Sequence, residues 1–259
     1  MKQRVITAIC LLAIVLPLLW LGGNFVFALV IAATTIATWE MLKMRNKKVN
    51  LPLWVVVAAF SGVSVLIFTP SFRLAMQMLG IILFPLLLVG YLRVRKNKDE
   101  YSFIILTIMY LGVAFRSLLL IRHHSLMLFL FLITTVILTD SAAYFAGRLF
   151  GKRKLAPSIS PNKTIAGAVG GLLIGALFAI IFGVLNSLFV NLWILIMLAV
   201  GIPILGQVGD LVASALKRQH DIKDYSNIFP GHGGVMDRID SQMLAAILLY
   251  VVILLGGVS

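Results

Sequence analysis

The sequence predicts an all-α, polytopic integral membrane protein with about nine transmembrane helices and a cytoplasmic N-terminus. Of its 259 residues, 61% are hydrophobic and only 12% are charged, whereas a soluble domain keeps about a quarter of its residues charged. The apolar residues come in blocks close to the roughly 20 residues that a helix needs to cross a bilayer. Short basic segments separate several of these blocks, as is typical of cytoplasmic loops.

The breaks between the apolar blocks place the expected helices. They run over 4–21, 24–42, 52–69, 73–92, 101–121, 125–147, 164–185, 190–209 and 241–257. The first block, "MKQRVITAICLLAIVLPLLWLGG", has the charged-then-apolar order of a signal peptide. Its apolar run of about 17 residues lacks a small-x-small cleavage site, so we expect a first membrane helix. Cys10, the single cysteine, lies in this helix and cannot form an intrachain disulfide.

The basic residues predict the orientation in the membrane. With the N-terminus in the cytoplasm, the predicted cytoplasmic segments contain all but three of the 22 Lys and Arg residues, the exceptions being Arg73, Arg116 and Arg122. This bias favours an N-terminus inside, a C-terminus outside and a multi-pass protein of the cell membrane. It also argues against a nucleic-acid partner, because the net charge of +13 is spread over loops that flank membrane helices.

Polar residues are distributed unevenly between the two halves of the chain. Residues 1–121 consist of apolar helices joined by simple basic loops, whereas nearly every unusual polar residue falls within 140–241. We therefore expect residues 1–121 to be a transmembrane scaffold and residues 122–259 to carry the chemistry, with a site that faces the cytoplasm. Glu40, in the first half, is expected to form an interfacial ion pair with Lys43.

Asp140 lies in "VILTDSAAYFAGR", seven residues before the expected end of its helix, which is roughly 10 Å inside the boundary. A carboxylate at this depth costs a few kcal/mol on insertion scales and usually faces a polar cavity or a partner. Tyr144 and Gly147 share its helix face. The alternative to a functional role is a structural pair with a buried basic residue such as Arg116.

Asp210 opens the stretch "GDLVASALKR". If the helix continues beyond 209, Asp210, Ser214 and Lys217 lie on one face, with Arg218 beside them. An acid, a hydroxyl and an ammonium group would then form one stripe. An amphipathic helix that emerges into water, with Lys217 and Arg218 as interfacial anchors, explains this stretch equally well.

The stretch "PGHGGVMDRID", residues 230–240, gathers groups suited to phosphate chemistry. The glycines around His232 allow positive φ and close approach to a ligand, and a glycine-rich turn before a helix can bind an anion. Arg238 offers a fork for phosphate, and Asp237 with Asp240 could hold Mg²⁺, which uses one or two carboxylates plus substrate phosphates. Acids that cap a helix explain one of the two aspartates but the pair less well.

A second polar loop, "GKRKLAPSISPNKT", contains Lys163 and Thr164 among two prolines and further hydroxyls. The G-x-x-x-G steps that follow at Gly167, Gly171 and Gly175 indicate close helix packing. Taken together, the residues support a cytoplasm-facing, metal-dependent site for phosphate chemistry, and they leave the substrate open.

Residues 214–240, "SALKRQHDIKDYSNIFPGHGGVMDRID", resemble the signature of the phosphatidate cytidylyltransferases, also called CDP-diglyceride synthases. The fixed positions of that signature fall on Ser214, Lys217, Arg218, Lys223, Asp224, His232, Gly233, Gly234, Asp237, Arg238 and Asp240. The segments "TDSAAYFAGRLFGK" and "ISPNKT" are also similar to this family. The resemblance covers about 140–241 by motif and the whole chain by topology.

This resemblance implies that CTP and phosphatidate react to give CDP-diacylglycerol and pyrophosphate, with membrane lipids around the protein and a homodimer as one state of assembly. It implies Mg²⁺ as cofactor and leaves a second, monovalent cation open. The implied catalytic residues are Asp210, Lys217, Asp237 and Arg238. The implied metal ligands are Asp210, Asp237 and Asp240, with Asp140 a weaker candidate. The implied substrate-binding residues are Lys163, Thr164, Ser214, Arg218, Lys223, His232, Gly233 and Gly234.

Two positions depart from the family pattern, because Ala166 and Ala213 stand where we expect glutamate. A family member without activity is therefore one alternative. A lipid kinase that uses CTP, with attack on the γ-phosphorus, is a second. A transporter of anionic lipids is a third, although its charged residues should line a path through the membrane rather than gather at one edge.

Overall fold

The helices of the computed structural model follow the predicted order, and the model describes residues 2–46, 53–69, 71, 74, 77, 78, 80, 81 and 98–258. The helix predicted over 73–92 lies almost entirely outside these described residues. The described helices are α1 (Lys2–Leu21), α2 (Gly23–Asn46), α3 (Leu53–Phe68), α5 (Lys98–His124), α6 (Leu126–Phe150), α7 (Ile165–Leu185), α8 (Leu192–Gln219) and α9 (Met236–Leu254).

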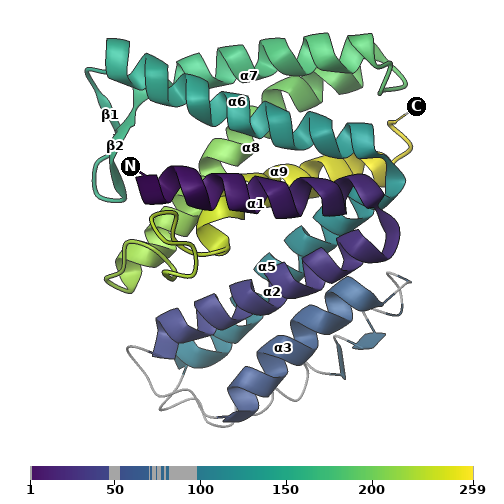
Figure 1. Ribbon diagram of the computed structural model, residues 1–259, viewed down its shortest axis with the longest axis vertical. Coiled ribbons are helices and arrows are strands. Elements are labelled where there is room, and N and C mark those ends of the chain that lie inside the picture. Colours follow the sequence, from purple (N-terminus) through teal and green to yellow (C-terminus); the bar gives the residue numbers. More distant parts are fainter. Residues whose placement is uncertain are drawn as a thin grey trace.

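Several of these helices are long and apolar enough to cross a membrane. Within the described residues five qualify, and they lie in α2, α5, α6, α7 and α8. Shorter apolar segments, Ile9–Leu21 and Val56–Phe68, lie in α1 and α3. The chain is thus a helical membrane protein, while the count of nine spans and the cytoplasmic N-terminus stay predictions. Figure 1 shows the two termini at opposite ends of the bundle.

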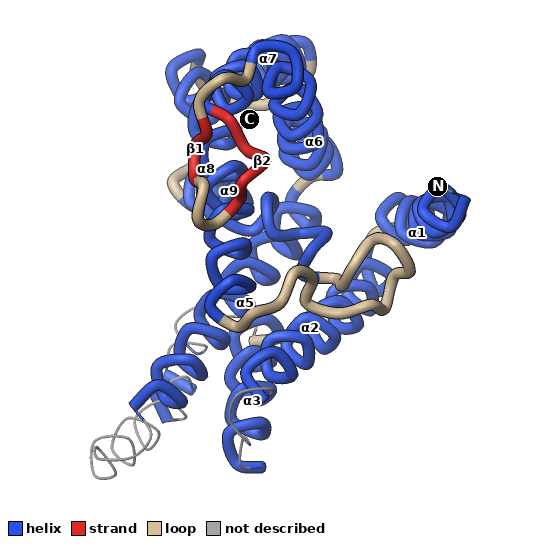
Figure 2. Tube along the Cα trace, turned by 90° about the vertical axis from the view of Figure 1, so that its left-hand side faces the viewer, coloured by secondary structure: helices blue, strands red, loops and turns tan. Residues whose placement is uncertain are grey.

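The structure fits the predicted all-α class, and the polar loop after α6 contains a small hairpin that the sequence did not indicate. Strand β1 (Lys154–Ala156) pairs antiparallel with β2 (Ser160–Thr164). Figure 2 shows this hairpin beside α8 and α9. Thr164 ends the hairpin and begins α7, since its hydroxyl accepts a hydrogen bond from the Gly167 amide at 3.1 Å.

Helices α8 and α9 show the largest extensions beyond their predicted bounds, and both extensions bring polar residues into regular structure. Helix α8 continues ten residues beyond 209, so Asp210, Ser214 and Lys217 do share a helical face. Helix α9 begins at Met236 rather than 241, so Asp237 and Asp240 lie in or next to its first turn.

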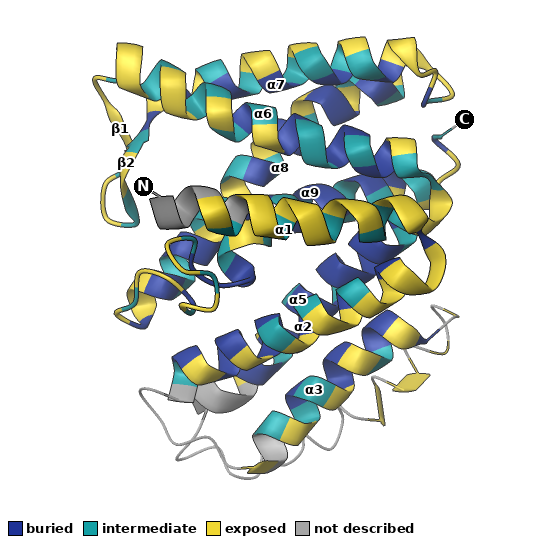
Figure 3. Cartoon of the chain, in the orientation of Figure 1, coloured by how far each residue is buried: buried dark blue, intermediate teal, exposed yellow. Residues whose placement is uncertain are grey.

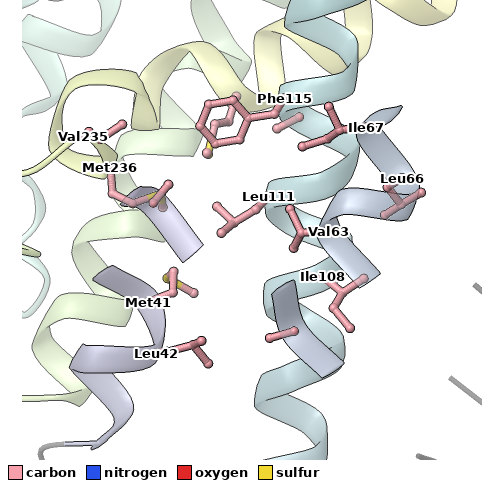
Figure 4. Close-up of a cluster of buried hydrophobic side chains, with 14 of the residues drawn as sticks. Met41, Leu42, Val63, Leu66, Ile67, Ile108, Leu111, Phe115, Val235 and Met236 are labelled. Carbon is pink, nitrogen blue, oxygen red and sulfur yellow. The ribbon is translucent and has the colours of Figure 1, made fainter. Parts of the chain in front are cut away.

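The buried side chains form two clusters, and each joins both halves of the chain. One cluster combines α2, α3 and α5 with Val235, Met236 and Met243, as Figure 4 shows for Val235 and Met236. The other combines the end of α5 with α6, α8 and α9. Figure 3 shows α5 largely buried and the described part of α1 largely exposed, whereas α7 alternates exposed and partly buried residues. Residues 1–121 and 122–259 therefore share their cores.

Two arginines predicted to lie outside the cytoplasmic loops bind carbonyl groups at helix ends. The Arg116 guanidinium donates to the carbonyl oxygens of Leu66 at 2.5 Å and Thr69 at 2.8 Å. Arg122 donates to the carbonyl oxygen of Leu19 at the end of α1. The suggested pair of Arg116 with Asp140 is therefore wrong, because the end of α3 occupies Arg116.

Helices α6 and α7 pack closely through the glycines of α7. A Cβ at Gly171 would lie 2.8 Å from the Thr139 carbonyl oxygen and 2.9 Å from the Ala143 Cβ. We expect Gly171→Val to destabilise the protein by about 1–3 kcal/mol, because two backbones must move apart. Thermal unfolding in detergent measures this, with Leu173→Phe as control, because Leu173 is 63% exposed. Equal melting temperatures for the two variants would contradict the expectation.

Candidate active site

A cavity of about 670 Å³ opens where the ends of α6, α8, α7 and α9 meet the hairpin. All residues that line it lie between 140 and 241. Eight predicted site residues lie in its wall: Asp140, Lys163, Thr164, Asp210, Lys217, Asp237, Arg238 and Asp240. Six further polar residues that carried no predicted role also line it: Tyr144, Arg148, Asn162, Gln207, Asp224 and Ser241. The cavity therefore brings together the carboxylates and cations that the sequence separates by up to 100 residues.

The first pair of charged side chains in the cavity, Lys163 and Asp210, joins the hairpin to α8. The Lys163 ammonium lies 2.6 Å from Oδ2 of Asp210, and both side chains are about a quarter exposed, at 26% and 29%. Oδ1 of Asp210 accepts a hydrogen bond from the Ser214 hydroxyl, one helical turn later, at 3.2 Å. Ser214 thus acts on Asp210 in this structure, and it does not itself line the cavity.

The second charged group is more deeply buried and joins α8 to α9. The Lys217 ammonium lies 2.7 Å from Oδ1 of Asp237 and 4.0 Å from Oδ2 of Asp240. The exposed fractions of the Lys217, Asp237 and Asp240 side chains are 10%, 4% and 12%. A buried ammonium needs such partners, because desolvation without them is costly.

Asp237 also organises the loop that leads into α9. Its Oδ2 accepts hydrogen bonds from the backbone amides of Tyr225 and Gly234, each at 2.9 Å. Gly233, with φ of +81°, lies so close that a Cβ there would be 2.6 Å from the same oxygen. Three donors thus engage the Asp237 carboxylate, so its first role in this structure is to hold the loop, and its role as a metal ligand stays a prediction.

Tyr225 is buried and connects this loop to α8. Its phenol donates to the Ala213 carbonyl oxygen at 3.2 Å, and the Lys217 ammonium lies 5.3 Å from the ring centroid. Burial, with the nearby charges of Asp240 and Asp237 in smaller part, raises the pKa of Tyr225 far above its usual value. The phenol therefore stays protonated and acts as a donor.

Glu40 contacts the loop that leads into α9, although the sequence indicated a surface ion pair with Lys43. Its side chain is fully buried and accepts hydrogen bonds from the Ser226 hydroxyl and from the amides of Val235 and Met236. Lys43 instead lies over the Trp39 ring. The predicted ion pair is therefore wrong. Its partners are 186 to 196 residues away, so no local pattern could have revealed them.

Six predicted substrate-binding residues lie outside the cavity wall: Ser214, Arg218, Lys223, His232, Gly233 and Gly234. Arg218 donates to the carbonyl oxygens of Ile159 and Ile222, and it thereby fixes the hairpin turn to the end of α8. Lys223 is exposed in the loop. His232 is half-buried, and its Nδ1 has no hydrogen-bond partner among the described residues. The binding roles of these residues stay predictions.

The two alanines that replace expected glutamates lie in different surroundings. Ala213 is fully buried, so a glutamate there would place another carboxylate in a closed space behind Asp210. Ala166 is half-buried in the first turn of α7, where an acid would suit the helix dipole.

Comparison with known proteins identifies the family. The model of the cytidylyltransferase family matches residues 2–255. The chain belongs to this family. A phosphatidate cytidylyltransferase of Bacillus subtilis is 38% identical over 269 residues, which cover 96% of each chain. A phosphatidate cytidylyltransferase of Staphylococcus epidermidis is 34% identical over 258 residues, which cover 98% of this chain and 99% of the other. That of Staphylococcus haemolyticus is 35% identical over 263 residues.

The cavity contains both carboxylates and cations, as an enzyme that binds nucleotide phosphates and a metal ion requires. Five aspartates line it, and two lysines pair directly with three of them. The two arginines of the wall, Arg148 and Arg238, are exposed at its rim. In the described part of the chain, no three His, Cys, Asp or Glu side chains are close enough to hold a metal ion by themselves. This donor set suits Mg²⁺ that is held by one or two carboxylates and by substrate phosphates.

Proposed function

We propose that this cytidylyltransferase transfers the cytidylyl group of CTP to phosphatidate, with CDP-diacylglycerol and pyrophosphate as products. The observation that carries the proposal is the cavity at one end of an apolar helix bundle, in which Lys163, Lys217 and Arg238 lie with five aspartates. Such a place suits a charged head group whose acyl chains stay in the bilayer. The names of the curated relatives support the same reaction. The proposed site faces the cytoplasm of a bacterial cell membrane.

The proposed step needs positioning and charge neutralisation. An ionised phosphatidate oxygen forms a new bond to the α-phosphorus of CTP, and the bond between this phosphorus and the bridging oxygen to the β-phosphorus breaks. Pyrophosphate leaves with the bonding electron pair, so no proton has to be removed from the nucleophile. Lys163, Lys217 and Arg238 would offset the repulsion of the two anions and orient them.

Mg²⁺ enters the proposal through the remaining carboxylates. One or two of Asp210, Asp240 and Asp140 would hold it together with substrate phosphates, since donors from the protein engage Asp237 more completely. When bound, Mg²⁺ would neutralise charge on the nucleotide phosphates. Lys163 would exchange its contact with Asp210 for a substrate phosphate. A homodimer stays an expectation and takes no part in this step.

We expect the purified protein to form CDP-diacylglycerol from labelled CTP and phosphatidate in detergent micelles only when Mg²⁺ is present. Label in the α-phosphate should enter the lipid, whereas label in the γ-phosphate should leave as pyrophosphate. Lipid that carries γ-label would instead identify a lipid kinase. Product formation would also show that glutamates at 166 and 213 are dispensable. A folded protein without product would contradict the proposed function.

A further inference from the structure

Glu40 is the point at which the N-terminal helices contact the loop before α9. It lies near the end of α2, is 0% exposed, and accepts hydrogen bonds from the amides of Val235 at 3.0 Å and Met236 at 2.9 Å. The Ser226 hydroxyl, from the other end of the same loop, donates to Oε1. All three partners are donors, which is the set that a carboxylate accepts.

Helix α9 has no side-chain cap of its own. Its N-cap residue, Val235, offers no side-chain acceptor to the first turn. The first amides of a helix need acceptors, and a negative group at this end also complements the helix dipole. Glu40 supplies both from a different helix. The same turn of α9 carries Asp237 and Arg238, with Asp240 next to it, so the cap fixes the part of the helix that lines the cavity.

Gly234 packs directly against the Glu40 carboxylate. A Cβ at Gly234 would overlap the Glu40 carboxylate, although the φ of Gly234 is not in the left-handed region. The neighbouring side chains fix the approach of the two helices, because Met41 and Met236 are both fully buried in one cluster (Figure 4). Gly234 is therefore required by the carboxylate rather than by its own backbone conformation.

We propose that Glu40 is a positioning residue for the reaction, which holds the first turn of α9 so that Asp237, Arg238 and Asp240 point into the cavity. The inference rests on the proposed function for its kinetic readout. Glu40 does not line the cavity, so it acts on substrates only through α9.

The test compares Glu40→Gln with Thr38→Val in the full-length protein. Glutamine keeps the shape of the Glu40 side chain but replaces one carboxylate oxygen by an NH₂ group. This donor would then face a backbone N–H that needs an acceptor. Thr38 is a matched control, because it is also 0% exposed on α2 and donates only to the Thr34 carbonyl of its own helix. We expect kcat to fall 10- to 100-fold in Glu40→Gln, as is typical when a group that supports active-site ligands is lost, and to stay within twofold in Thr38→Val.

Hydrogen–deuterium exchange provides a readout that does not depend on activity. In Glu40→Gln the amides of residues 234–238 should exchange faster than in Thr38→Val, at matched global stability. Gly234→Ala should reproduce the loss of kcat, and adding Glu40→Gln to it should cause little further loss, since both changes disrupt one contact. Unchanged exchange at 234–238, or equal kcat losses in Glu40→Gln and Thr38→Val, would overturn the inference. A wild type without product would count against the proposed function, and the exchange data would then decide the Glu40 contact alone.

Discussion

Replacing Asp237 by alanine is expected to abolish cytidylyl transfer and to lower the free energy of unfolding by about 3–5 kcal/mol, the range for breaking one partner out of a buried ion pair. The change leaves the Lys217 ammonium, 10% exposed, without its partner at 2.7 Å. It also removes the acceptor for the amides of Tyr225 and Gly234. Chemical denaturation in detergent and the CTP assay measure the two effects separately.

A second substitution separates folding from chemistry in this variant. In Lys217→Met with Asp237→Ala, both members of the 2.7 Å pair are gone, and only Asp240 loses its more distant partner at 4.0 Å, so we expect part of the lost stability to return. Activity should stay absent, because the cavity has lost both a cation and a carboxylate. If the double variant is no more stable than Asp237→Ala, the loop contacts of Asp237 outweigh its ion pair, and our account of the pair is wrong.

Replacing Lys163 by alanine should show the opposite combination, a large loss of activity with little loss of stability. Lys163 and Asp210 are about a quarter exposed, and pairs of this kind contribute about 0–1 kcal/mol. If Lys163 orients a substrate phosphate, kcat/KM should fall by about 10²–10³-fold, which is the usual effect of removing one electrostatic contact to a reacting group.

Lys154→Ala is the matched control for this change. Lys154 lies on β1 of the same hairpin, is exposed and does not line the cavity. The same positive charge is thus removed a few residues away. A loss of similar size in both variants would mean that the general charge of the hairpin matters rather than Lys163, and would remove Lys163 from the substrate site.

The parts of the site that sequence could predict are those encoded by helical spacing. Asp210, Ser214 and Lys217 recur at the period of a helix face, and the structure places them on one. Asp140 was recognised because a carboxylate within an apolar block is rare, and it does line the cavity. Spacing could not show which lysine pairs with which aspartate, because these pairs join different elements.

Long-range contacts and irregular backbone account for the remaining differences. Proximity in sequence suggests Lys43 as the partner of Glu40, and charge suggests Asp140 as a partner of Arg116. In the structure, both side chains instead form hydrogen bonds with backbone groups of other segments. The hairpin was missed because its strands are short and polar and lack the alternation that indicates a half-buried strand. The loop over 220–235 contains no regular element that periodicity could predict.

The core around Met41, Leu111 and Met236 has a consequence for how such proteins can be recombined. These side chains come from α2, α5 and α9 and interlock in one cluster. A chimera that joins residues 1–121 of one relative to residues 122–259 of another would inherit the two sides of this contact from different parents. The unit that has to be exchanged together to keep this core is therefore not a contiguous half of the chain, but α2, α3 and α5 with the start of α9.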